Sequence, residues 1–251
     1  MRAISITLAL RHGCPILAGV TYRGILLDFY GTVVEEDDLV VRAIVDKLAD
    51  EHPGVSGRDL GHLWWDGFSS TLAAAHGRTF RTQRDLTIQA LGAVLDQLGS
   101  DLDPVELTQE LFDFWRRPAL LPGAAEFLAS CPVPICVVSN IDSADIRATI
   151  THHGLSLPLV VTSEDVRSYK PRPELFERGL ELLQLEPGEV LHIGDSLTSD
   201  IAGANALGID VAWVNTKARE APASARIRQH ITDLREVLLD VGVEASASAV
   251  R

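Results

Sequence analysis

Charged and hydroxyl side chains follow several apolar stretches of this 251-residue chain, at the point where each stretch ends. Asp28 comes directly after GILL, and Ser139 ends ICVVS. Lys170 lies in SYKPRP, and Asp195 and Asp200 lie in GDSLTSD. A carboxylate can attack an electrophilic centre or hold a hard cation, whereas a lysine and a hydroxyl can hold an anion. Because ligands bind at the carboxyl ends of the strands of an open parallel sheet, we expect these side chains to meet in one crevice.

The elements that would position these side chains are short buried strands that alternate with helices. The apolar runs are continuous rather than alternating, as expected for parallel strands that are buried on both faces. Helical patterns separate them, and Gly154 follows one such pattern at a position suited to a helix C-terminus. This alternation predicts an α/β fold with a doubly wound, Rossmann-like parallel sheet. The predicted strands cover residues 24–29, 134–139, 157–162, 190–193 and 211–215.

One long segment breaks the alternation. Residues 36–117 contain several helical patterns and no convincing strand; Val40, Ile44 and Leu48, for example, share one helix face. We therefore predict an all-helical module inserted after the first strand and its turn. The predicted division is an N-terminal extension over 1–19, a core over 20–35 and 118–242, the helical module over 36–117 and a disordered tail over 243–251.

The composition narrows the class of protein. The formal net charge of −13 argues against a protein that binds the phosphate backbone of nucleic acids. The three cysteines have no regular spacing, so we expect free thiols in a reducing compartment rather than a disulfide framework. No apolar run approaches the length that spans a bilayer, and the apolar start of the chain lacks a convincing cleavage site. We therefore expect a cytoplasmic monomer or homodimer with neither nucleic acid nor membrane as its partner.

The motifs DFYGT, VVSN, SYKPRP and GDSLTSD, in this order, resemble those of the haloacid dehalogenase-like (HAD) hydrolase superfamily. The resemblance covers residues 24–216, and the inserted module looks like the helical, C1-type cap of that family. It implies that Asp28 is a nucleophile, which attacks to form a covalent aspartyl intermediate. The implied substrate is a small phosphorylated metabolite, because a cap that closes over the site excludes macromolecules.

The same resemblance assigns roles to the other strand-end residues. A hard cation prefers oxygen ligands, so the implied Mg²⁺ ligands are the side chains of Asp28, Asp195 and Asp200 and the backbone carbonyl of Tyr30. The implied groups that stabilise a transferring phosphoryl group are Lys170, the hydroxyl of Ser139 and the backbone N–H groups near Phe29 and Asn140.

Tyr30 departs from the pattern of most phosphatases in this family. There the residue two positions after the nucleophile is an aspartate, which protonates the leaving oxygen and then activates water. A tyrosine, with a pKa of about 10, can donate a proton but is a poor base at neutral pH. Loss of a general acid typically costs about 10²–10⁴ in rate, so the substitution is a large change.

The pattern Asp-x-Tyr-Gly-Thr is similar to that of the 2-haloacid dehalogenases of the family, whose halide leaving group needs no proton. Those enzymes carry Ser-Ser-Asn-x-x-Asp in the last motif, whereas this chain has Asp195 and Leu197. They also use a cap arginine, where this chain has Trp65. We favour hydrolysis of a phosphate monoester; 2-haloacid dehalogenation, or a weakly active or non-catalytic binding protein of the same fold, are the alternatives.

Two further groups of residues receive a structural interpretation. Trp64, Trp65 and Phe68 lie on one helical segment of the predicted cap, and we interpret them as packing of the cap interior or of its seam with the core. His192 lies inside a predicted strand, and we interpret it as a buried histidine with a partner rather than as a ligand.

Overall fold

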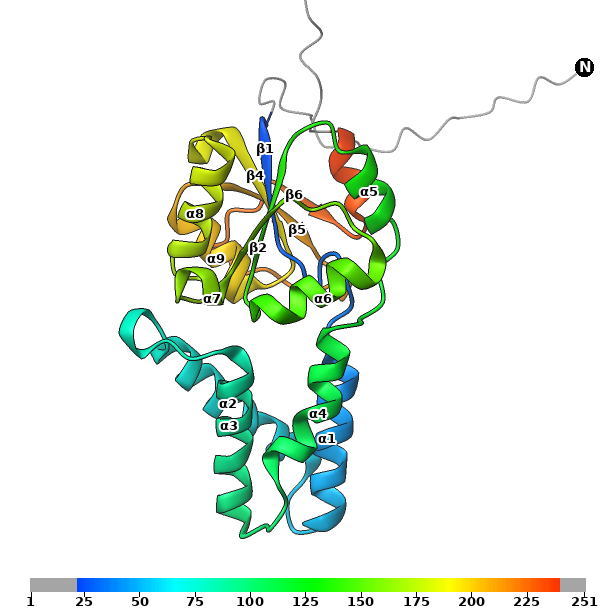
Figure 1. The fold of residues 1–251 in the computed structure, drawn as a ribbon, viewed down its shortest axis with the longest axis vertical. Coiled ribbons are helices and arrows are strands. Elements are labelled where there is room, and N and C mark those ends of the chain that lie inside the picture. Colours follow the sequence, from blue (N-terminus) through cyan, green and yellow to red (C-terminus); the bar gives the residue numbers. More distant parts are fainter. Residues whose placement is uncertain (1–21, 240–251) are drawn as a thin grey trace, which may run out of the picture.

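A computed structural model describes residues 22–239 of the chain. These residues form two lobes, a sheet with helices on both of its faces and a helical lobe at one end of it (Figure 1). The predicted extension over 1–19 and the predicted tail over 243–251 lie outside the described residues, as does Cys14. The two cysteines that are described, Cys131 and Cys136, are free thiols.

The sheet has six parallel strands in the order β3-β2-β1-β4-β5-β6. This order confirms the prediction of a doubly wound parallel sheet, with β1 at its centre and β2 and β4 as its neighbours. The strands are β1 (Gly24–Leu27), β2 (Ile135–Ser139), β3 (Leu159–Thr162), β4 (Val190–Gly194), β5 (Asp210–Val214) and β6 (Gln229–Ile231).

The strand boundaries differ from the predicted ones at two places that matter. The first strand ends at Leu27 rather than at residue 29, because the carbonyl of Phe29 accepts the N–H groups of Val33 and Val34 and so begins a turn. The sixth strand, β6, was not predicted. Its three residues QHI carry no apolar run; β6 pairs with β5, and Ile231 is buried in the core.

Alternate residues of each strand face opposite layers of helices, which explains the continuous apolar runs. Ile25 and Leu27 of β1 pack toward α5 (Ala124–Ser130) and α6 (Ser143–His153). Leu26 packs toward α8 (Glu174–Leu183) and α9 (Ala202–Ala206) on the other face. The short helix α7 (Ser163–Val166) follows β3, and the 3₁₀ turns Pro187–Glu189 and Leu234–Leu239 complete the core lobe.

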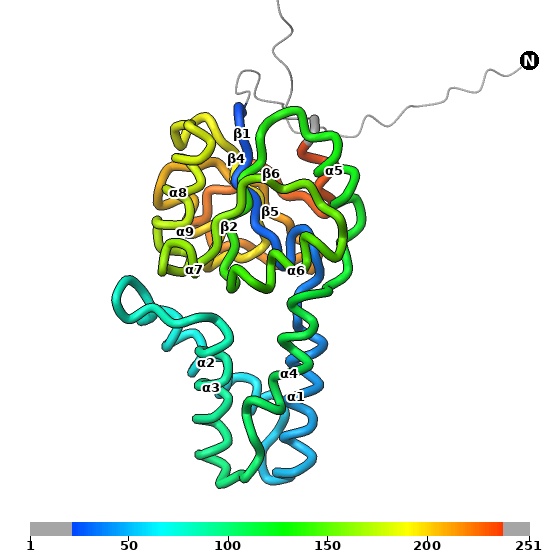
Figure 2. The backbone as a smooth tube through the Cα atoms, in the orientation of Figure 1, coloured from blue at the N-terminus to red at the C-terminus, as the bar shows by residue number. Residues whose placement is uncertain are grey.

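The cap lobe consists of helices alone. Its helices are α1 (Asp38–Glu51), α2 (Gly57–Ala74), α3 (Gln83–Leu98) and α4 (Pro104–Trp115), with a 3₁₀ turn at Gly77–Thr79. The backbone trace in Figure 2 leaves the core after β1, runs through these four helices and returns to the core before α5. Among residues 22–239, no helix combines the length and the apolar character needed to cross a membrane.

The start of cap helix α3 is capped by an acid of the core lobe. A helix begins with backbone N–H groups that have no partner inside the helix. Asp142, which precedes α6, accepts the N–H groups of Gln83 at 2.7 Å and of Arg84 at 3.1 Å. The third N–H group, that of Asp85, goes to the hydroxyl of Thr82 at 3.2 Å. The core lobe therefore satisfies two of the N–H groups at the start of this cap helix.

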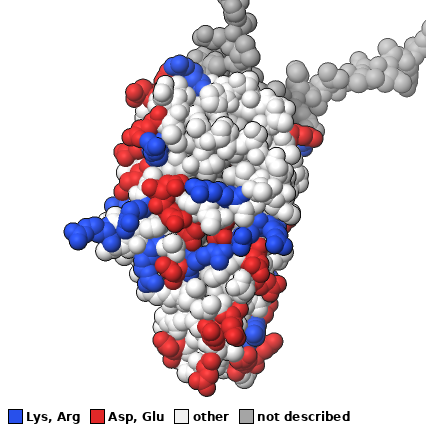
Figure 3. All heavy atoms as spheres, viewed as in Figure 1, with Lys and Arg blue, Asp and Glu red and all other residues white. Residues whose placement is uncertain are grey.

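Charged side chains extend this seam between the lobes. Figure 3 shows Lys and Arg beside Asp and Glu across the junction of the two lobes. Arg84 Nε donates to Asp145 Oδ2 at 2.8 Å, and its guanidinium lies 4.5 Å from the centre of the Phe112 ring. Asp145 is 1% exposed, so this pair is shielded from water on the core side.

The tip of the cap, between α2 and α3, is docked on the core as well. Arg167 accepts the N–H of Gly77 at 2.8 Å through its carbonyl and donates its own Nε to the carbonyl of Gly77 at 2.9 Å. The Tyr169 hydroxyl donates to the carbonyl of Arg81 at 2.8 Å, and its ring stacks on Phe80 at 5.3 Å. The cap is thus joined to the core at its tip as well as through the two segments of chain that connect the lobes.

Candidate active site

Asp28 lies at the carboxyl end of the central strand. Its backbone N–H donates to the carbonyl of Ile193 in β4 at 2.8 Å, so the strand pairing fixes its backbone. Its side chain is buried, and Oδ1 accepts a hydrogen bond from Lys170 Nζ at 2.7 Å. The turn that follows contains Gly31 with φ of +85°, where a Cβ would lie 2.9 Å from Asp195 Oδ1. Glycine therefore lets the turn pass close to the second acid.

Lys170 is a buried cation that joins two of the predicted acids. Its Nζ lies 2.7 Å from Asp28 Oδ1 and 2.6 Å from Asp200 Oδ1, and the residue is 1% exposed. Burial acts to lower the pKa of Lys170, but the charges of Asp200 and Asp28 outweigh it and raise that pKa above its ordinary value. Lys170 therefore stays positively charged in the crevice.

Asn140 holds Lys170 in place. Its side-chain amide donates to the Lys170 carbonyl at 3.0 Å and accepts the Lys170 backbone N–H at 2.7 Å. These two bonds occupy the amide, so the Asn140 side chain positions the lysine. Ser139, the residue before it, ends β2 next to Asp28 and is 1% exposed. The structure therefore gathers Asp28, Ser139, Asn140 and Lys170 at one edge of the sheet.

Three buried acids lie together at this edge. One carboxylate oxygen each of Asp28, Asp195 and Asp200 lies within 4.8 Å of the other two. Burial and the charge of Asp200 raise the pKa of Asp28, against the lowering effect of Lys170. Burial, with the charges of Asp200 and Asp28, raises the pKa of Asp195 to about 8. With Lys170 as their positive partner, the three acids therefore resist being ionised all at once.

Asp200 is the most firmly held of the three acids. Besides Lys170, its Oδ1 lies 3.0 Å from His192 Nε2, and its Oδ2 accepts the backbone N–H of Ser196 at 3.0 Å. Burial acts to raise the pKa of Asp200, but Lys170 and His192 hold it well below its usual range. His192 is fully buried and has this one partner; its Nδ1 has no hydrogen-bond partner among the described residues. Asp200 sits in a single π-helical turn, Leu197–Ile201, directly after β4.

Asp195 is held by residues that sequence reasoning missed. Its backbone carbonyl accepts Trp213 Nε1 at 2.7 Å and the Arg219 guanidinium at 2.8 Å. Arg219 also donates to the Asp195 carboxylate at 3.2 Å, from a side chain that is 37% exposed. Arg219 lies in the loop after β5, where nothing in the sequence marks it, because an exposed loop arginine is usually solvated.

The donor set of this cluster fits a hard divalent cation. Carboxylate oxygens are the ligands that Mg²⁺ prefers, and it is commonly bound through one or two carboxylates with several waters. Of the predicted ligands, the structure brings together the side chains of Asp28, Asp195 and Asp200, and Tyr30 lies two residues along the turn from Asp28. A cation at this point would offset the charge that raises the pKa of Asp28 and Asp195.

The Tyr30 hydroxyl is engaged away from the acids. It donates to the backbone carbonyl of Trp115 at 2.5 Å, at the end of α4, and lies 3.4 Å from Thr149 Oγ1. Thr149 donates to the same carbonyl at 2.8 Å. Burial raises the pKa of Tyr30 well above its ordinary value. Tyr30 therefore links the first motif and α6 to the C-terminal end of cap helix α4.

Replacing Tyr30 with phenylalanine is expected to leave enzymatic turnover unchanged, because the hydroxyl bonds the Trp115 carbonyl rather than the acid cluster. Thermal unfolding should show a loss of about 0.5–1.5 kcal/mol, the usual contribution of one hydrogen bond. Tyr22→Phe is the matched control, since it removes a hydroxyl that donates to Asp210 at 2.6 Å. A loss in kcat of about 10²-fold or more in Tyr30→Phe alone would instead identify Tyr30 as the acid.

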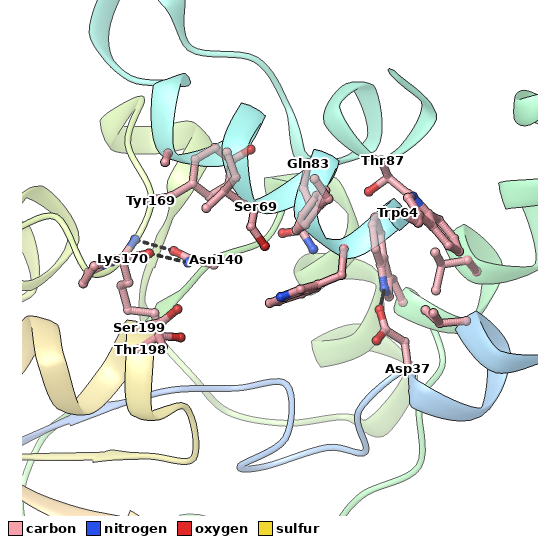
Figure 4. A pocket seen from close by; sticks show the side chains of 18 of the residues that line it. Asp37, Trp64, Ser69, Gln83, Thr87, Asn140, Tyr169, Lys170, Thr198 and Ser199 are labelled. Carbon is pink, nitrogen blue, oxygen red and sulfur yellow. Dashed lines mark hydrogen bonds between the residues drawn. The ribbon is translucent and has the colours of Figure 1, made fainter. Parts of the chain in front are cut away.

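A pocket of about 660 Å³ lies between the cap and this edge of the sheet. At the core end it reaches Asn140, Lys170 and the turn that carries Thr198 and Ser199 (Figure 4). Its cap walls are largely apolar, and the apolar side chains of α1, α2 and α4 that form them include Val41, Trp64, Trp65, Phe68, Leu111 and Trp115. The pocket therefore offers an apolar chamber directly beside the buried lysine.

The interpretation of the cap aromatic residues as packing is only partly correct. Trp64 is 5% exposed and belongs to the apolar core of the cap. Trp65, by contrast, is 62% exposed, and all three side chains, including that of Phe68, line the pocket. The helical spacing could not separate these roles, because Trp64 and Trp65 are adjacent and the pocket forms only where the cap meets the core.

A parallel α/β sheet with an acid cluster at its carboxyl edge and a helical cap defines a class of hydrolases. The model of the haloacid dehalogenase-like hydrolase family matches residues 22–208, and the chain belongs to that family. It is 26% identical to haloacetate dehalogenase H-2 of Moraxella sp. (strain B) over 202 residues, 77% of this chain and 85% of that protein.

Two further relatives differ in the activity that they are named for. The phosphoserine phosphatase of Thermus thermophilus is 31% identical over 139 residues, 53% of this chain and 56% of that protein. The structure of the L-2-haloacid dehalogenase of Xanthobacter autotrophicus with chloropropionic acid covalently bound superposes with a TM-score of 0.68 at 20% identity, over 87% of this chain and 98% of that one. The likeness in structure establishes the fold.

Proposed function

We propose that this chain is a Mg²⁺-dependent phosphatase that transfers the phosphoryl group of a small phosphate monoester to Asp28 and then to water. The observation that supports the proposal is the third buried carboxylate, Asp195, beside Asp28 and Asp200. Three clustered acids repel an anionic substrate and one another unless a cation accompanies them. The serine that the 2-haloacid dehalogenases carry at this position would add no such charge.

Each residue of the site has its own role in the proposed reaction. The Asp28 carboxylate attacks phosphorus, and the strand end holds it beside Lys170, which lines the pocket. Lys170 holds Asp28 Oδ1 and supplies positive charge beside the transferring group, while Asn140 keeps the lysine in place. Mg²⁺, held by the three aspartates, would supply further positive charge for the phosphoryl oxygens. Water then attacks the aspartyl phosphate, which releases phosphate and restores Asp28.

Dehalogenation is the second candidate, and Tyr30 is the observation that favours it, together with the dehalogenases among the relatives. A haloacid carries a carboxylate that needs a positive partner. Among the described residues, the basic side chains that line the pocket are Lys170 and Arg172, both from the core, and Lys170 is already paired with two acids. The cap contributes no arginine to the described pocket wall. The geometry thus favours phosphoryl transfer.

The substrate that we propose is a small molecule, since the pocket is enclosed between the cap and the core. We propose neither nucleic acid nor membrane as a partner, because the chain carries a net charge of −13. For the assembly we retain the expectation of a monomer or homodimer, which sedimentation of the purified protein would test.

Hydrolysis of 4-nitrophenyl phosphate is expected in the presence of Mg²⁺ and is expected to stop when a chelator is added. The physical reason is that the raised pKa of Asp28 and Asp195 favours their protonated forms, and a bound cation would favour the carboxylate that the nucleophile requires. The same preparation is assayed for chloride release from 2-chloropropionate. Chloride release that persists in chelator, without phosphate release in Mg²⁺, would replace the phosphatase by a dehalogenase.

A further inference from the structure

The cap pocket has a composition that selects among phosphate esters. Its cap walls present three tryptophans, Trp64, Trp65 and Trp115, beside Phe68 and Leu72. Flat apolar walls of this kind bind flat apolar groups, because both surfaces leave water and ring contacts add to the gain. A sugar would instead bring several hydroxyl groups, each of which needs a polar partner to leave water without cost.

Few polar atoms of the pocket remain to meet such hydroxyl groups. Asp37, the one acid that lines it, already accepts Trp115 Nε1 at 2.7 Å. Among the described residues, three buried polar atoms of the pocket wall have no hydrogen-bond partner. Arg172 Nε belongs to the core lobe and lies 3.5 Å from Glu174 Oε1 in an ion pair, whereas Ser69 Oγ and Gln83 Oε1 belong to the cap. Figure 4 shows both side chains on the cap side of Asn140 and Lys170. They can satisfy a single hydrogen-bonding substituent at the edge of an otherwise apolar group.

The first motif restricts the leaving group of the ester, by a separate argument. A leaving oxygen that departs without a proton must be stable as an anion. Position 30 carries no carboxylate, and the Tyr30 hydroxyl donates to Trp115 instead. A phenol has a pKa of about 10, as the side chain of tyrosine does, whereas an alkyl alcohol is several units less acidic. A phenolate therefore leaves unassisted far more readily than an alkoxide.

We propose that the substrate is an aryl phosphate, the phosphate monoester of a flat, phenol-type group that fills the cap pocket and bears one hydrogen-bonding substituent near Ser69 and Gln83. The inference rests on the proposed phosphatase activity and specifies its substrate class. In the first step an oxygen of Asp28 forms a bond to phosphorus, the bond from phosphorus to the aryl oxygen breaks, and its electron pair leaves with the phenolate. Solvent protonates the phenolate, and water then hydrolyses the aspartyl phosphate to inorganic phosphate.

The test compares kcat/KM for four substrates in the presence of Mg²⁺. 1-Naphthyl phosphate and 4-nitrophenyl phosphate supply aryl leaving groups, cyclohexylmethyl phosphate supplies an apolar alkyl one, and glucose 6-phosphate supplies a sugar. We expect 1-naphthyl phosphate to exceed glucose 6-phosphate by about 10²-fold or more, since a mismatch of polar groups is penalised on that scale. We also expect both aryl esters to exceed the alkyl ester. Equal values for the aryl, alkyl and sugar esters would overturn the inference while leaving the phosphatase intact.

Acetyl phosphate and a binding assay separate this inference from the proposed function. Acetyl phosphate has a good leaving group but nothing to fill the pocket. Binding of 1-naphthylphosphonate, which is not hydrolysed, is followed by quenching of tryptophan fluorescence, because three of the four tryptophans line the pocket. Phosphonate binding without turnover of any ester would retain the aryl site and reject the phosphatase. Acetyl phosphate turnover without binding of 1-naphthylphosphonate would retain the phosphatase and reject the aryl site.

A pocket variant and its control complete the test. Trp65→Ala removes an exposed wall residue, so the fold does not depend on it, and we expect about a 10-fold loss in kcat/KM for 1-naphthyl phosphate with acetyl phosphate unchanged. Leu39→Ala removes a side chain of the cap that is 81% exposed and does not line the pocket. This control should change kcat/KM for neither 1-naphthyl phosphate nor acetyl phosphate. Equal losses for both substrates in Trp65→Ala would count against an aryl site.

Discussion

Asparagine in place of Asp28 is expected to abolish phosphate release from 4-nitrophenyl phosphate, with a loss in kcat of about 10⁴-fold or more. An amide keeps the shape of the carboxylate but cannot act as the nucleophile. The hydrogen bond that the side-chain oxygen accepts from Lys170 can still form, so the folded structure should persist. The measurement is steady-state turnover in Mg²⁺, with circular dichroism to check the fold.

Asp210→Asn is the matched control for this change. Asp210 also belongs to a strand of the sheet, but it lies at the amino end of β5, opposite the acid cluster, and pairs with the hydroxyl of Tyr22. Turnover should be unaltered in Asp210→Asn. If Asp28→Asn kept a tenth or more of the wild-type turnover, the nucleophile would have to be another group.

Methionine in place of Lys170 is expected to cause the largest loss of stability. The change removes the one buried cation that contacts both Asp28 and Asp200 and leaves both acids without it in a dry crevice. Breaking a buried pair in this way costs about 3–5 kcal/mol, which lowers the melting temperature by roughly 6–20 °C for a protein of this size. Thermal unfolding in chelator is the measurement, since it keeps metal ions from offsetting the loss.

Lys47 provides the control, because it is an exposed lysine of α1 without an ion pair among the described residues. Lys47→Met should change stability by no more than about 0.5 kcal/mol. Mg²⁺ is expected to recover part of the stability of Lys170→Met, because it would bind the same acids. A melting temperature unchanged by Lys170→Met would show that the acids are not held by this lysine.

The sequence was sufficient to predict the core and the position of its acids, for a physical reason. Strands buried on both faces must be apolar throughout, so the runs 24–29 and 190–193 stood out, and polar residues at the end of such a run must lie at the carboxyl edge of the sheet. Asp28 and Asp195 could therefore be brought together from the strands alone, whereas Lys170, in the loop beyond β3 and α7, was placed by its motif. The three-residue β6 could not be predicted, because its pairing with β5 rather than its own composition makes it a strand.

The parts of the site that depend on contacts between lobes were not predictable. Asp142 looked like an ordinary residue at the start of a core helix, yet it caps a helix of the other lobe 59 residues away in the chain. Tyr30 was identified as unusual, but its rotamer, directed at the Trp115 carbonyl, depends on where α4 ends. The apolar pocket likewise exists only in the assembled pair of lobes, so helical periodicity could assign Trp65 to no partner.

The capping of α3 by Asp142 links entry to the active site with the integrity of a helix. Any opening of the cap that separates Gln83 and Arg84 from Asp142 exposes two backbone N–H groups to water. Loss of such a cap typically costs about 1 kcal/mol, which biases the resting enzyme toward the closed state. Opening of the cap is therefore expected to speed the exchange of the amide hydrogens of these two residues with solvent. Hydrogen exchange at Gln83 and Arg84 can therefore report the opening of the cap in the absence of substrate.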